Sequence, residues 1–288
     1  MRKSNVIVIL GQTATGKSAL AVKIAKLIGG EIISADSRQV YKKLNIGTGK
    51  ITKKETRGIP HYLIDVANPK KQFTVAEYKK LAEKKIEEII KRGKVPIICG
   101  GTGFYIDAIT KGVILPEVPP NRVLRKGLEK KSCEALFKVL KKLDKNRAKN
   151  IDQKNKVRLI RAIEIAKYLG RVPPLKTKPS PYKFIKIGLF LPQDVLKNKI
   201  NQRVKKMFKE GLLKEIDNLK KSGISQKRLQ EFGFEYFKPT EERVVRETTR
   251  YAKRQMTWFK RDKGIKWFDS SESEKVIKFM LTGNCTKV

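Results

Sequence analysis

One short stretch constrains the fold of this chain more than any other. The sequence GQTATGKS, from Gly11 to Ser18, directly follows the apolar run VIVIL. The spacing Gly-x4-Gly-Lys-Ser is typical of a phosphate-binding loop between a buried strand and a helix, whose backbone N–H groups point at the anion. In such a loop Lys17 reaches the distal phosphates, and Ser18 offers a hydroxyl to Mg²⁺. The candidate phosphate-binding residues are Gly11, Gln12, Thr13, Ala14, Thr15, Gly16, Lys17 and Ser18.

Strand and helix patterns alternate along residues 1–110. Buried strands are indicated by NVIVIL, EIISAD, HYLIDV and VPIICGG, and Thr74 with Glu77 forms a capping box before a helix. After residue 182 the segment KFIKIGLFL returns to a buried strand pattern. Helical segments, a short IKWF strand and a frayed tail are expected after it. We therefore predict an α/β fold, a P-loop-type parallel sheet with flanking helices.

Residues 111–182 have a different character. Pro116, Pro119 and Pro120 mark a linker, and the segments EALFKVLKKL and VRLIRAIEIAKYLG have helical periodicity. No strand-like run interrupts this region. We expect a small all-helical insertion at 111–182, within a catalytic core formed by residues 1–110 and 183–288.

The charge of the chain indicates a polyanionic partner. Its 288 residues include 67 Lys and Arg against 28 Asp and Glu, for a formal net charge of +39. The codon bias of an AT-rich genome also enriches lysine, and both explanations can apply. On a long helix expected from Thr240 to about Lys263, the basic side chains fall within an arc about 120° wide, which favours contact with an RNA backbone. These residues are Arg243, Arg246, Arg250, Lys253, Arg254, Lys260 and Arg261.

Cysteine usage and hydropathy indicate a cytoplasmic protein. Cys99, Cys133 and Cys285 stand far apart without metal-ligand spacing, which is typical of a reduced protein without a disulfide or zinc framework. The N-terminal apolar run leads into the phosphate loop, so it is expected to be a core strand and not a signal peptide. No run approaches the length of a membrane span. We expect no membrane partner and, by default, a monomer.

A second loop, ISADSRQVYKKLNIGTGK, places Asp36 at the carboxyl end of the second expected strand. Ligands of open parallel sheets bind at this edge. The carboxylate of Asp36 could hold a metal ion through water, act as a general base, or cap the next helix, and spacing leaves these roles open. The ligand also stays open at this point. No guanine motif is present, whereas a small-molecule or nucleotide kinase that binds ATP fits the phosphate loop.

Six motifs together resemble the tRNA dimethylallyltransferase family, also called tRNA isopentenyltransferase, in its bacterial form. They occur in the order GQTATGKS, DSRQVYKKLNIGTGK, HYLID, GGTGFYIDAI, RLIRAIE and YAKRQMTWFKR. The resemblance implies transfer of a dimethylallyl group from dimethylallyl diphosphate to N6 of the adenosine 3′-adjacent to the tRNA anticodon. Prenyl transfer to free AMP is a related alternative that needs no basic surface. The chain departs from the family at GFEY, where Phe234 and Glu235 replace the usual Tyr and Lys or Arg.

The resemblance also implies roles for single residues. Lys17, the loop amides and Arg203, with Mg²⁺ on Ser18, would neutralise the departing diphosphate. Asp36 would take the proton of N6, and Thr102 would face the reacting centre. Contacts with tRNA are implied for Asp36, Ser37, Arg38, Gln39 and Thr102 near the target nucleotide, and for Arg122, Val157, Arg158, Leu159, Ile160 and Arg161 in the insertion. The basic helix adds Arg250, Lys253 and Arg254.

Overall fold

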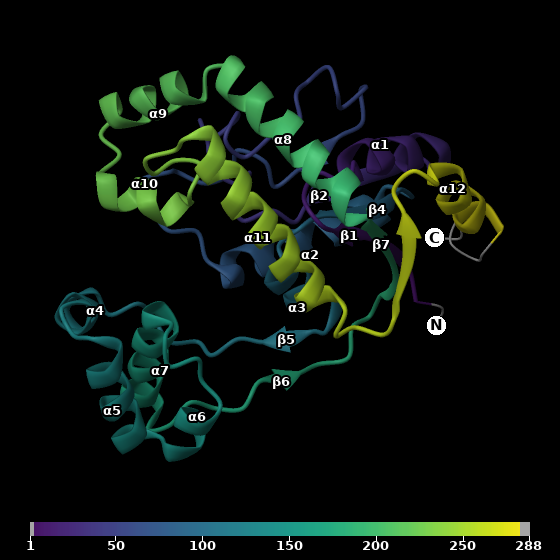
Figure 1. Ribbon diagram of the computed structural model, residues 1–288. Coiled ribbons are helices and arrows are strands. Elements are labelled where there is room, and N and C mark those ends of the chain that lie inside the picture. The colour runs from purple at the N-terminus through teal and green to yellow at the C-terminus, as the bar shows by residue number, and fades with distance from the viewer. Residues whose placement is uncertain (1–2, 283–288) are drawn as a thin grey trace. The chain divides into compact units, whose positions relative to one another are not determined.

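A computed structural model describes residues 3–282 of the chain (Figure 1). The chain divides into two compact units. The first comprises Met1–Gly112 with Pro179–Val288, and the second comprises Val113–Lys178. The sequence suggested divisions at 110/111 and 182/183. Within the described residues, no helix combines the length and the apolar character that crossing a membrane requires.

The first unit is built on a six-stranded sheet in which every pair of neighbours is parallel. The order is β3-β2-β4-β1-β7-β8. The strands are β1 (Asn5–Gly11), β2 (Gly30–Ser34), β3 (His61–Tyr62), β4 (Val95–Gly100), β7 (Lys183–Phe190) and β8 (Ile265–Asp269). Because the strands are parallel, the carboxyl ends of β1, β2 and β4 meet at one edge, where ligands of such sheets bind.

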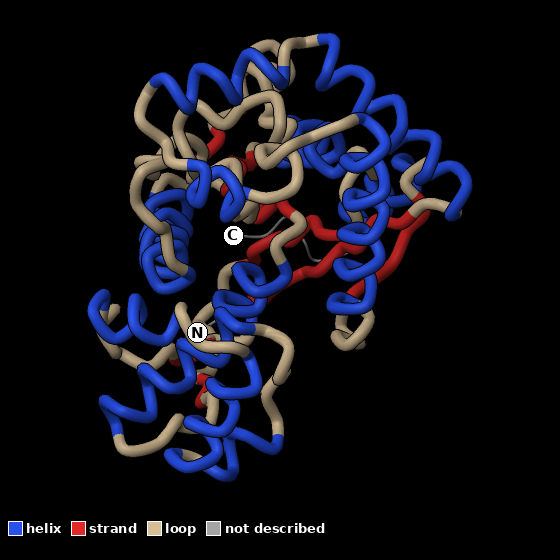
Figure 2. Tube along the Cα trace, turned by 60° about the vertical axis from the view of Figure 1, so that its left-hand side comes forward, coloured by secondary structure: helices blue, strands red, loops and turns tan. Residues whose placement is uncertain are grey.

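Helices cover both faces of this sheet, as Figure 2 shows with strands in red and helices in blue. They are α1 (Lys17–Ile28), α2 (Val75–Lys91), α3 (Gly103–Thr110), α8 (Gln193–Lys209), α9 (Leu212–Lys221), α10 (Gln226–Phe232), α11 (Glu241–Phe259) and α12 (Ser273–Thr282). Alternate residues of β1 enter two different cores. Val8 joins a cluster with α2, α3, α9 and α10, whereas Ile9 joins a cluster with α1 and α12. This arrangement confirms the predicted α/β fold.

Two local expectations have clear outcomes. The capping box is confirmed, since Thr74 accepts from the Glu77 backbone and the Glu77 side chain accepts from the Thr74 backbone. The expectation of a frayed C-terminal tail was wrong for the described residues, because residues 273–282 form α12. Val276 and Met280, one helical turn apart, are both buried against the α1 side of the core. That apolar pair gives the helix its packing face.

The second unit consists of α4 (Arg122–Glu129), α5 (Cys133–Leu143), α6 (Lys145–Lys149) and α7 (Lys156–Leu169), with β5 (Val113–Ile114) antiparallel to β6 (Lys176–Thr177). The short antiparallel pair of β5 and β6 corrects the expectation that this insertion contains helices alone. Two residues per strand are too few to show an alternating pattern. The helices bury a core of their own around Leu128, Leu136, Leu140, Leu159 and Ile163.

One buried carboxylate holds the helices of the second unit together. Only 1% of the Glu164 side chain is exposed. Its Oε1 accepts from the Asn121 backbone at 2.7 Å and from Arg125 Nε at 2.8 Å. Its Oε2 accepts from Arg125 Nη2 at 2.7 Å and from Arg161 Nη1. Burial opposes ionisation, but the bonds from Arg125, Asn121 and Arg161 lower the pKa of Glu164, so the ionised carboxylate is satisfied in place.

We expect Glu164→Gln to destabilise the second unit by about 3 kcal/mol, because it leaves two partly buried arginines without their counter-charge. Chemical denaturation followed by circular dichroism measures the loss. The exposed Glu117 lies in the same unit, and Glu117→Gln serves as the control, which should stay within about 0.5 kcal/mol of wild type. Equal stabilities of the two variants would contradict this role for Glu164.

Candidate active site

The segment from Gly11 to Ser18 forms a tight loop between β1 and α1. Its backbone conformation is left-handed at Ala14, with φ 63°, and at Gly16, with φ 79°. At Gly11 an added Cβ would lie 2.2 Å from the backbone oxygen of Leu189 on β7, so that position requires glycine. Thr15 is buried and its hydroxyl donates to the Gln12 oxygen at 2.8 Å. The loop is thus held by its own side chains before any ligand binds.

Lys17 stands at the base of this loop. Its ammonium group donates to the Gln12 backbone oxygen. Burial, with a smaller effect from the positive charge of Arg203, lowers the pKa of Lys17 to about 8, while Cys99 and Asp36 act in the opposite direction. Because its surroundings disfavour the charged form, Lys17 is strongly stabilised by an anion bound in the loop.

Asp36 follows β2 and faces the same edge of the sheet. Its Oδ1 accepts from the backbone of Arg38 at 2.8 Å and of Gln39 at 3.3 Å. These bonds cap a turn and not a helix, because residues 37–40 are not helical. The negative charge of Asp36 reaches both Lys17 and Arg203 and favours their protonated forms. The capping role and a chemical role of this carboxylate are therefore compatible.

Thr102 joins the loop after β4 to the loop after β2. Its Oγ1 accepts from the Ser37 backbone at 3.0 Å, and its backbone N–H donates to the Ala35 oxygen at 3.1 Å. The preceding Gly100 is needed for this approach, since an added Cβ there would lie 2.2 Å from the Ala35 oxygen. Thr102 is consequently fixed beside the segment that carries Asp36.

Arg203 of α8 completes the set of candidate catalytic residues. Its Nη2 donates to the Thr48 oxygen at 3.2 Å, and an added Cβ at Gly49 would lie 2.1 Å from the same nitrogen. Burial lowers the pKa of Arg203, whereas the charges of Asp36 and Glu235 raise it. The structure thus brings Lys17, Asp36 and Arg203 within one electrostatic neighbourhood, and Thr102 is bonded to the residue after Asp36.

Glu215 of α9 holds the turn on which Arg203 rests. It accepts from the backbones of Asn45 at 2.9 Å, Ile46 at 2.8 Å and Gly47 at 3.2 Å. The Tyr236 hydroxyl donates to it at 2.8 Å. Sequence reasoning missed this carboxylate, because its partners lie about 170 residues away and no spacing connects them.

Glu235, the departure from the family pattern, lies in the same neighbourhood. Burial raises the pKa of Glu235 to about 7, with Arg38 and Arg203 opposing the rise and Asp36 adding to it. A carboxyl group therefore lies near Arg38 and Arg203, at a position where the resemblance predicts Lys or Arg. It titrates in the physiological range.

Gln255 and Tyr251, on the inward face of α11, are two further residues of the site that the sequence analysis did not single out. Gln255 bonds to both the phosphate loop and the loop after β4. Burial raises the pKa of Tyr251 well above its ordinary value, and the Thr102 side chain opposes that rise. Helical periodicity gave neither residue a role, because it cannot reveal the partner of a buried polar group.

The predicted RNA contacts divide into exposed and buried residues. Leu159 and Ile160 are 0% and 8% exposed in the core of the second unit, so direct contact of their side chains with RNA is corrected to a packing role. Arg161 is bonded to Glu164 and to the Val118 oxygen. The remaining predicted positions of this unit are exposed, and these are Arg122, Val157 and Arg158.

On α11, the outward basic side chains Arg250, Lys253 and Arg254 are exposed. Arg250 also pairs with Glu247 at 2.9 Å. Glu247 therefore offsets part of the positive charge of this face. Lys253 and Arg254 keep that face positively charged.

The described residues contain no group of three or more His, Cys, Asp or Glu side chains arranged to hold a metal ion. Mg²⁺ binds by one or two protein oxygens together with substrate phosphates and water, so a single hydroxyl beside the loop is sufficient. Ser18, exposed in the first turn of α1, meets that requirement. Cys99 and Cys133 are free thiols, and burial raises the pKa of Cys99 to about 11. Cys285 lies outside the described residues.

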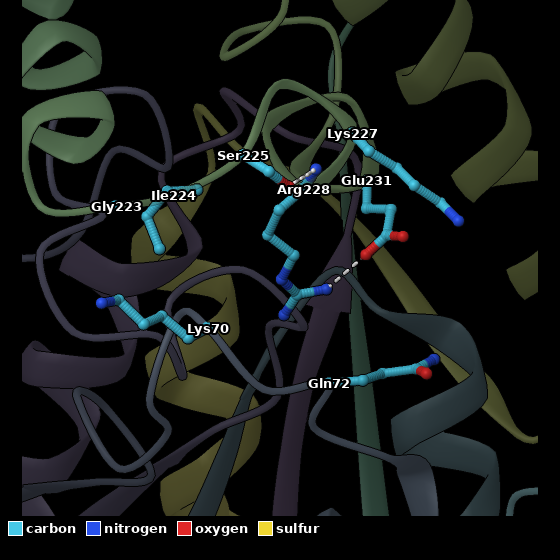
Figure 3. Close-up of a pocket in the computed structure, with 8 residues that line it drawn as sticks. All are labelled: Lys70, Gln72, Gly223, Ile224, Ser225, Lys227, Arg228 and Glu231. Atoms are coloured by element: carbon cyan, nitrogen blue, oxygen red, sulfur yellow. Dashed lines mark hydrogen bonds and ion pairs between the residues drawn. The ribbon is translucent and has the colours of Figure 1, made fainter. Parts of the chain in front are cut away.

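A separate cavity of about 390 Å³ lies where the α9–α10 turn meets the segment before α2 (Figure 3). Its central arginine, Arg228, is used within the protein. Nε donates to the Pro69 oxygen at 2.8 Å, Nη2 to the Lys71 oxygen at 2.7 Å, and Nη1 to Glu231 at 2.7 Å. These bonds of Arg228 connect α10 to the loop before α2. None of the residues that line the cavity belongs to the candidate active site.

Comparisons with known proteins agree with one another. A family model described as IPP transferase matches residues 39–262, a span that begins after the phosphate loop and Asp36. A tRNA dimethylallyltransferase of Halothermothrix orenii is 40% identical, covering 94% of this chain and 89% of that protein. One from a Thermoanaerobacter species, strain X514, is 42% identical and covers 91% of each chain.

Solved structures show the same similarity. The full-length tRNA isopentenylpyrophosphate transferase of Bacillus halodurans superposes with a TM-score of 0.72 at 35% identity, covering 97% of this chain and 96% of that one. A eukaryotic dimethylallyltransferase described as acting on tRNA gives a TM-score of 0.78 at 24% identity, covering 98% of this chain and 76% of that one. At 24% identity, the similarity to the eukaryotic protein shows a shared fold alone.

The pKa of Glu235 generates a prediction for stability. A carboxyl whose pKa rises from 4.5 to about 7 on folding makes the folded state lose stability as the pH rises from 4.5 to 7. We therefore expect Glu235→Gln to match wild type near pH 4.5 and to exceed its stability by about 3 kcal/mol at pH 8. Urea denaturation across this pH range measures the difference.

The exposed Glu210 on α8 provides the matched control. Because its ion pair with Lys206 lies at the surface, Glu210→Gln should change stability by less than about 1 kcal/mol, without this pH profile. If Glu235→Gln followed the wild-type pH dependence, Glu235 would not be the buried titrating acid.

Proposed function

This chain belongs to the IPP transferase family, and on that premise we propose that it transfers a dimethylallyl group from dimethylallyl diphosphate to N6 of the adenosine 3′-adjacent to the anticodon of tRNA. The family match covers most of the chain, and its full-length relatives are tRNA dimethylallyltransferases. The chain is a tRNA prenyltransferase, and the resemblance seen in the motifs is confirmed. The position of the modified base and the identity of the donor are the proposal.

The observation that carries the proposal is the convergence of Lys17, Asp36, Thr102 and Arg203 at one edge of the sheet. The exocyclic amine attacks the allylic carbon, a C–N bond forms, and the bond from that carbon to the bridging diphosphate oxygen breaks. The N6 proton goes to Asp36, whose carboxylate already lies in the field of two cations. Lys17, the loop N–H groups and Arg203 take up the negative charge of the leaving diphosphate.

Mg²⁺ fits the same proposal. Ser18 would hold the ion together with oxygens of the diphosphate, and the ion would supply further neutralisation of the leaving group. No cluster of carboxylates is needed for that mode of binding. All of the proposed catalytic residues come from one chain, so we propose that a monomer suffices, acting in the cytoplasm on tRNA.

The second unit and the outer face of α11 are proposed to bind the RNA. Support comes from exposed arginines, Arg122 and Arg158, and from the exposed Val157, which is 75% accessible and can contact a base. On α11 the exposed Lys253 and Arg254 can contact phosphates. We propose that the second unit binds the anticodon stem-loop. The target adenosine must leave its stack to reach Asp36.

The decisive experiment offers purified protein, Mg²⁺ and labelled dimethylallyl diphosphate to an unmodified tRNA with adenosine after the anticodon. We expect label in the tRNA, and we expect Asp36→Asn to lower the rate by about 10²–10⁴-fold because the proton acceptor is lost. Asp194→Asn, at an exposed position in the first turn of α8, is the matched control and should retain wild-type activity.

Other outcomes separate the alternatives. Label in AMP but not in tRNA would move the acceptor to a free nucleotide. Hydrolysis of ATP with phosphorylation of a small molecule, and no prenyl transfer, would favour a kinase. Transfer to tRNA that survives in Asp36→Asn would leave the family activity intact and remove Asp36 from the mechanism.

The pKa of Lys17 predicts how donor affinity depends on pH. With about 8 as its value in the free protein, Lys17 loses its charge above that pH, while a bound diphosphate keeps it protonated. Affinity for dimethylallyl diphosphate should therefore be flat between pH 7 and 8 and then fall by up to about tenfold per pH unit. The last phosphate ionisation, near pH 6, is already complete.

Calorimetric titration of the donor in the absence of tRNA measures this dependence. Lys17→Arg is the matched variant, since a guanidinium stays charged across the range, and its affinity should not show the decline. The same decline in both proteins would assign the titration to another group.

A further inference from the structure

Residues 45–50 form a single turn beside the candidate active site. Within it, the Gly49 N–H donates to the Ile46 oxygen at 2.9 Å, and the Lys50 N–H donates to the Asn45 oxygen at 2.9 Å. Such a turn has N–H groups without a partner in the turn at its start and carbonyl groups without one at its end, as a helix does. The start therefore attracts an anion, and the end attracts a cation.

Glu215 of α9 lies at the start of the turn and uses each carboxylate oxygen twice. Its Oε2 accepts from the N–H groups of Asn45 and Ile46, at 2.9 Å and 2.8 Å. Its Oε1 accepts from the Gly47 N–H at 3.2 Å and from the Tyr236 hydroxyl at 2.8 Å. A glutamine has one acceptor oxygen with two lone pairs, so it could serve half of these four donors.

Arg203 of α8 lies at the end of the turn. Its Nη2 donates to the Thr48 oxygen at 3.2 Å, which uses one of the five N–H donors of a guanidinium. Gln39 Nε2 donates to the Thr48 and Gly49 oxygens at 3.4 Å and 3.3 Å. Because Gln39 follows Asp36 by three residues, the turn connects a cation of the site to the segment that carries Asp36.

Lys50 holds the same turn independently of Glu215. Its side chain is 6% exposed. Its Nζ donates to the Tyr41 oxygen at 2.9 Å, to Asn45 Oδ1 at 2.9 Å and to Asp65 Oδ1 at 2.6 Å. A change at position 215 should therefore shift the turn without unfolding it.

We propose that Glu215 is a positioning residue for diphosphate binding, which sets the place of the Arg203 guanidinium through the turn of residues 45–50. The inference rests on the proposed function, in which Arg203 neutralises the leaving diphosphate, and adds to it the residue that fixes this arginine. Helices α8 and α9 follow one another along the chain (Figure 1), and the turn is bonded to both. Glu215 acts through Arg203 and needs no contact with the donor.

The test is Glu215→Gln, which keeps the size of the side chain and removes half of its acceptor capacity. In calorimetric titrations without tRNA, the Kd for dimethylallyl diphosphate should rise about tenfold, because Arg203 loses the carbonyl position that orients it. Asp217→Asn on the same helix is the matched control. Its side chain is 60% exposed and pairs with Lys220 at 2.9 Å, so the Kd should stay within about twofold of wild type.

A double-mutant cycle separates positioning from a general effect on packing. In an Arg203→Met background, Lys17 and the phosphate loop still bind the donor. Glu215→Gln should there change the Kd by less than about twofold, because the guanidinium that it positions is already gone. A Glu215 that only stabilised the fold would weaken donor binding by the same factor in both backgrounds.

If Glu215→Gln fails to fold, Tyr236→Phe replaces it in the cycle. That substitution removes one of the four bonds to the carboxylate and keeps the buried ring. We expect it to raise the Kd for the donor about threefold in the wild-type background and to leave it unchanged in the Arg203→Met background.

Two results would overturn the inference while leaving the proposed function intact. One is wild-type donor affinity in the folded test variant, and the other is an equal loss of affinity with and without Arg203. If the wild-type chain neither binds dimethylallyl diphosphate nor transfers its prenyl group to tRNA, the proposed function fails and the inference fails with it.

Discussion

The parallel pairing of β1 with β4 on one side and β7 on the other is the constraint from which the rest of the site follows. Ile9 lies opposite Cys99 and Ile187, so the three strands end at the same level. The phosphate loop and the Thr102 loop therefore leave the sheet side by side, and the segment of Asp36 leaves from β2 beyond β4. Close approach of these backbones excludes side chains at Gly11 and Gly100.

The charged groups at the carboxyl edge of the sheet then determine which ligand can bind there. Lys17 and Arg203 are partly buried cations whose pKa values are lowered by desolvation, which is the state expected of a site organised for an anion. Asp36 and Glu235 partly compensate these charges. Among the described residues neither forms an ion pair with Arg203, which donates to the Thr48 oxygen. The cations thus remain available to a diphosphate. Glu235 is the unusual member, because it places a carboxyl with a raised pKa where the family pattern has Lys or Arg.

Much of this arrangement could be predicted from the sequence, and the failures have physical causes. Glycine spacing and strand patterns located the phosphate loop, Asp36 and the Thr102 loop because these depend on local backbone geometry. Gln255 and Glu215 escaped because their partners are more than 150 residues away and only folding brings them together. Leu159 and Ile160 were assigned to RNA by resemblance to a motif, although their apolar side chains pack in the core. The β5–β6 ladder was too short to leave a pattern.

The two faces of α11 differ in chemistry, as the proposed binding of RNA on one side and of the donor on the other requires. Its buried residues, including Ala252 and Gln255, pack on α8 and bond to the loops of the site (Figure 1). Its exposed residues include Lys253 and Arg254, each adjacent in sequence to a buried one. Successive residues of a helix point about 100° apart, so a basic outer face and a polar inner face can occupy the same turns. An RNA bound to the outer face would then lie one helix diameter from the loops that hold Lys17 and Thr102. The distance between the proposed RNA-binding face and the loops of the site would be set by the thickness of a helix, about 10 Å, and not by a flexible linker.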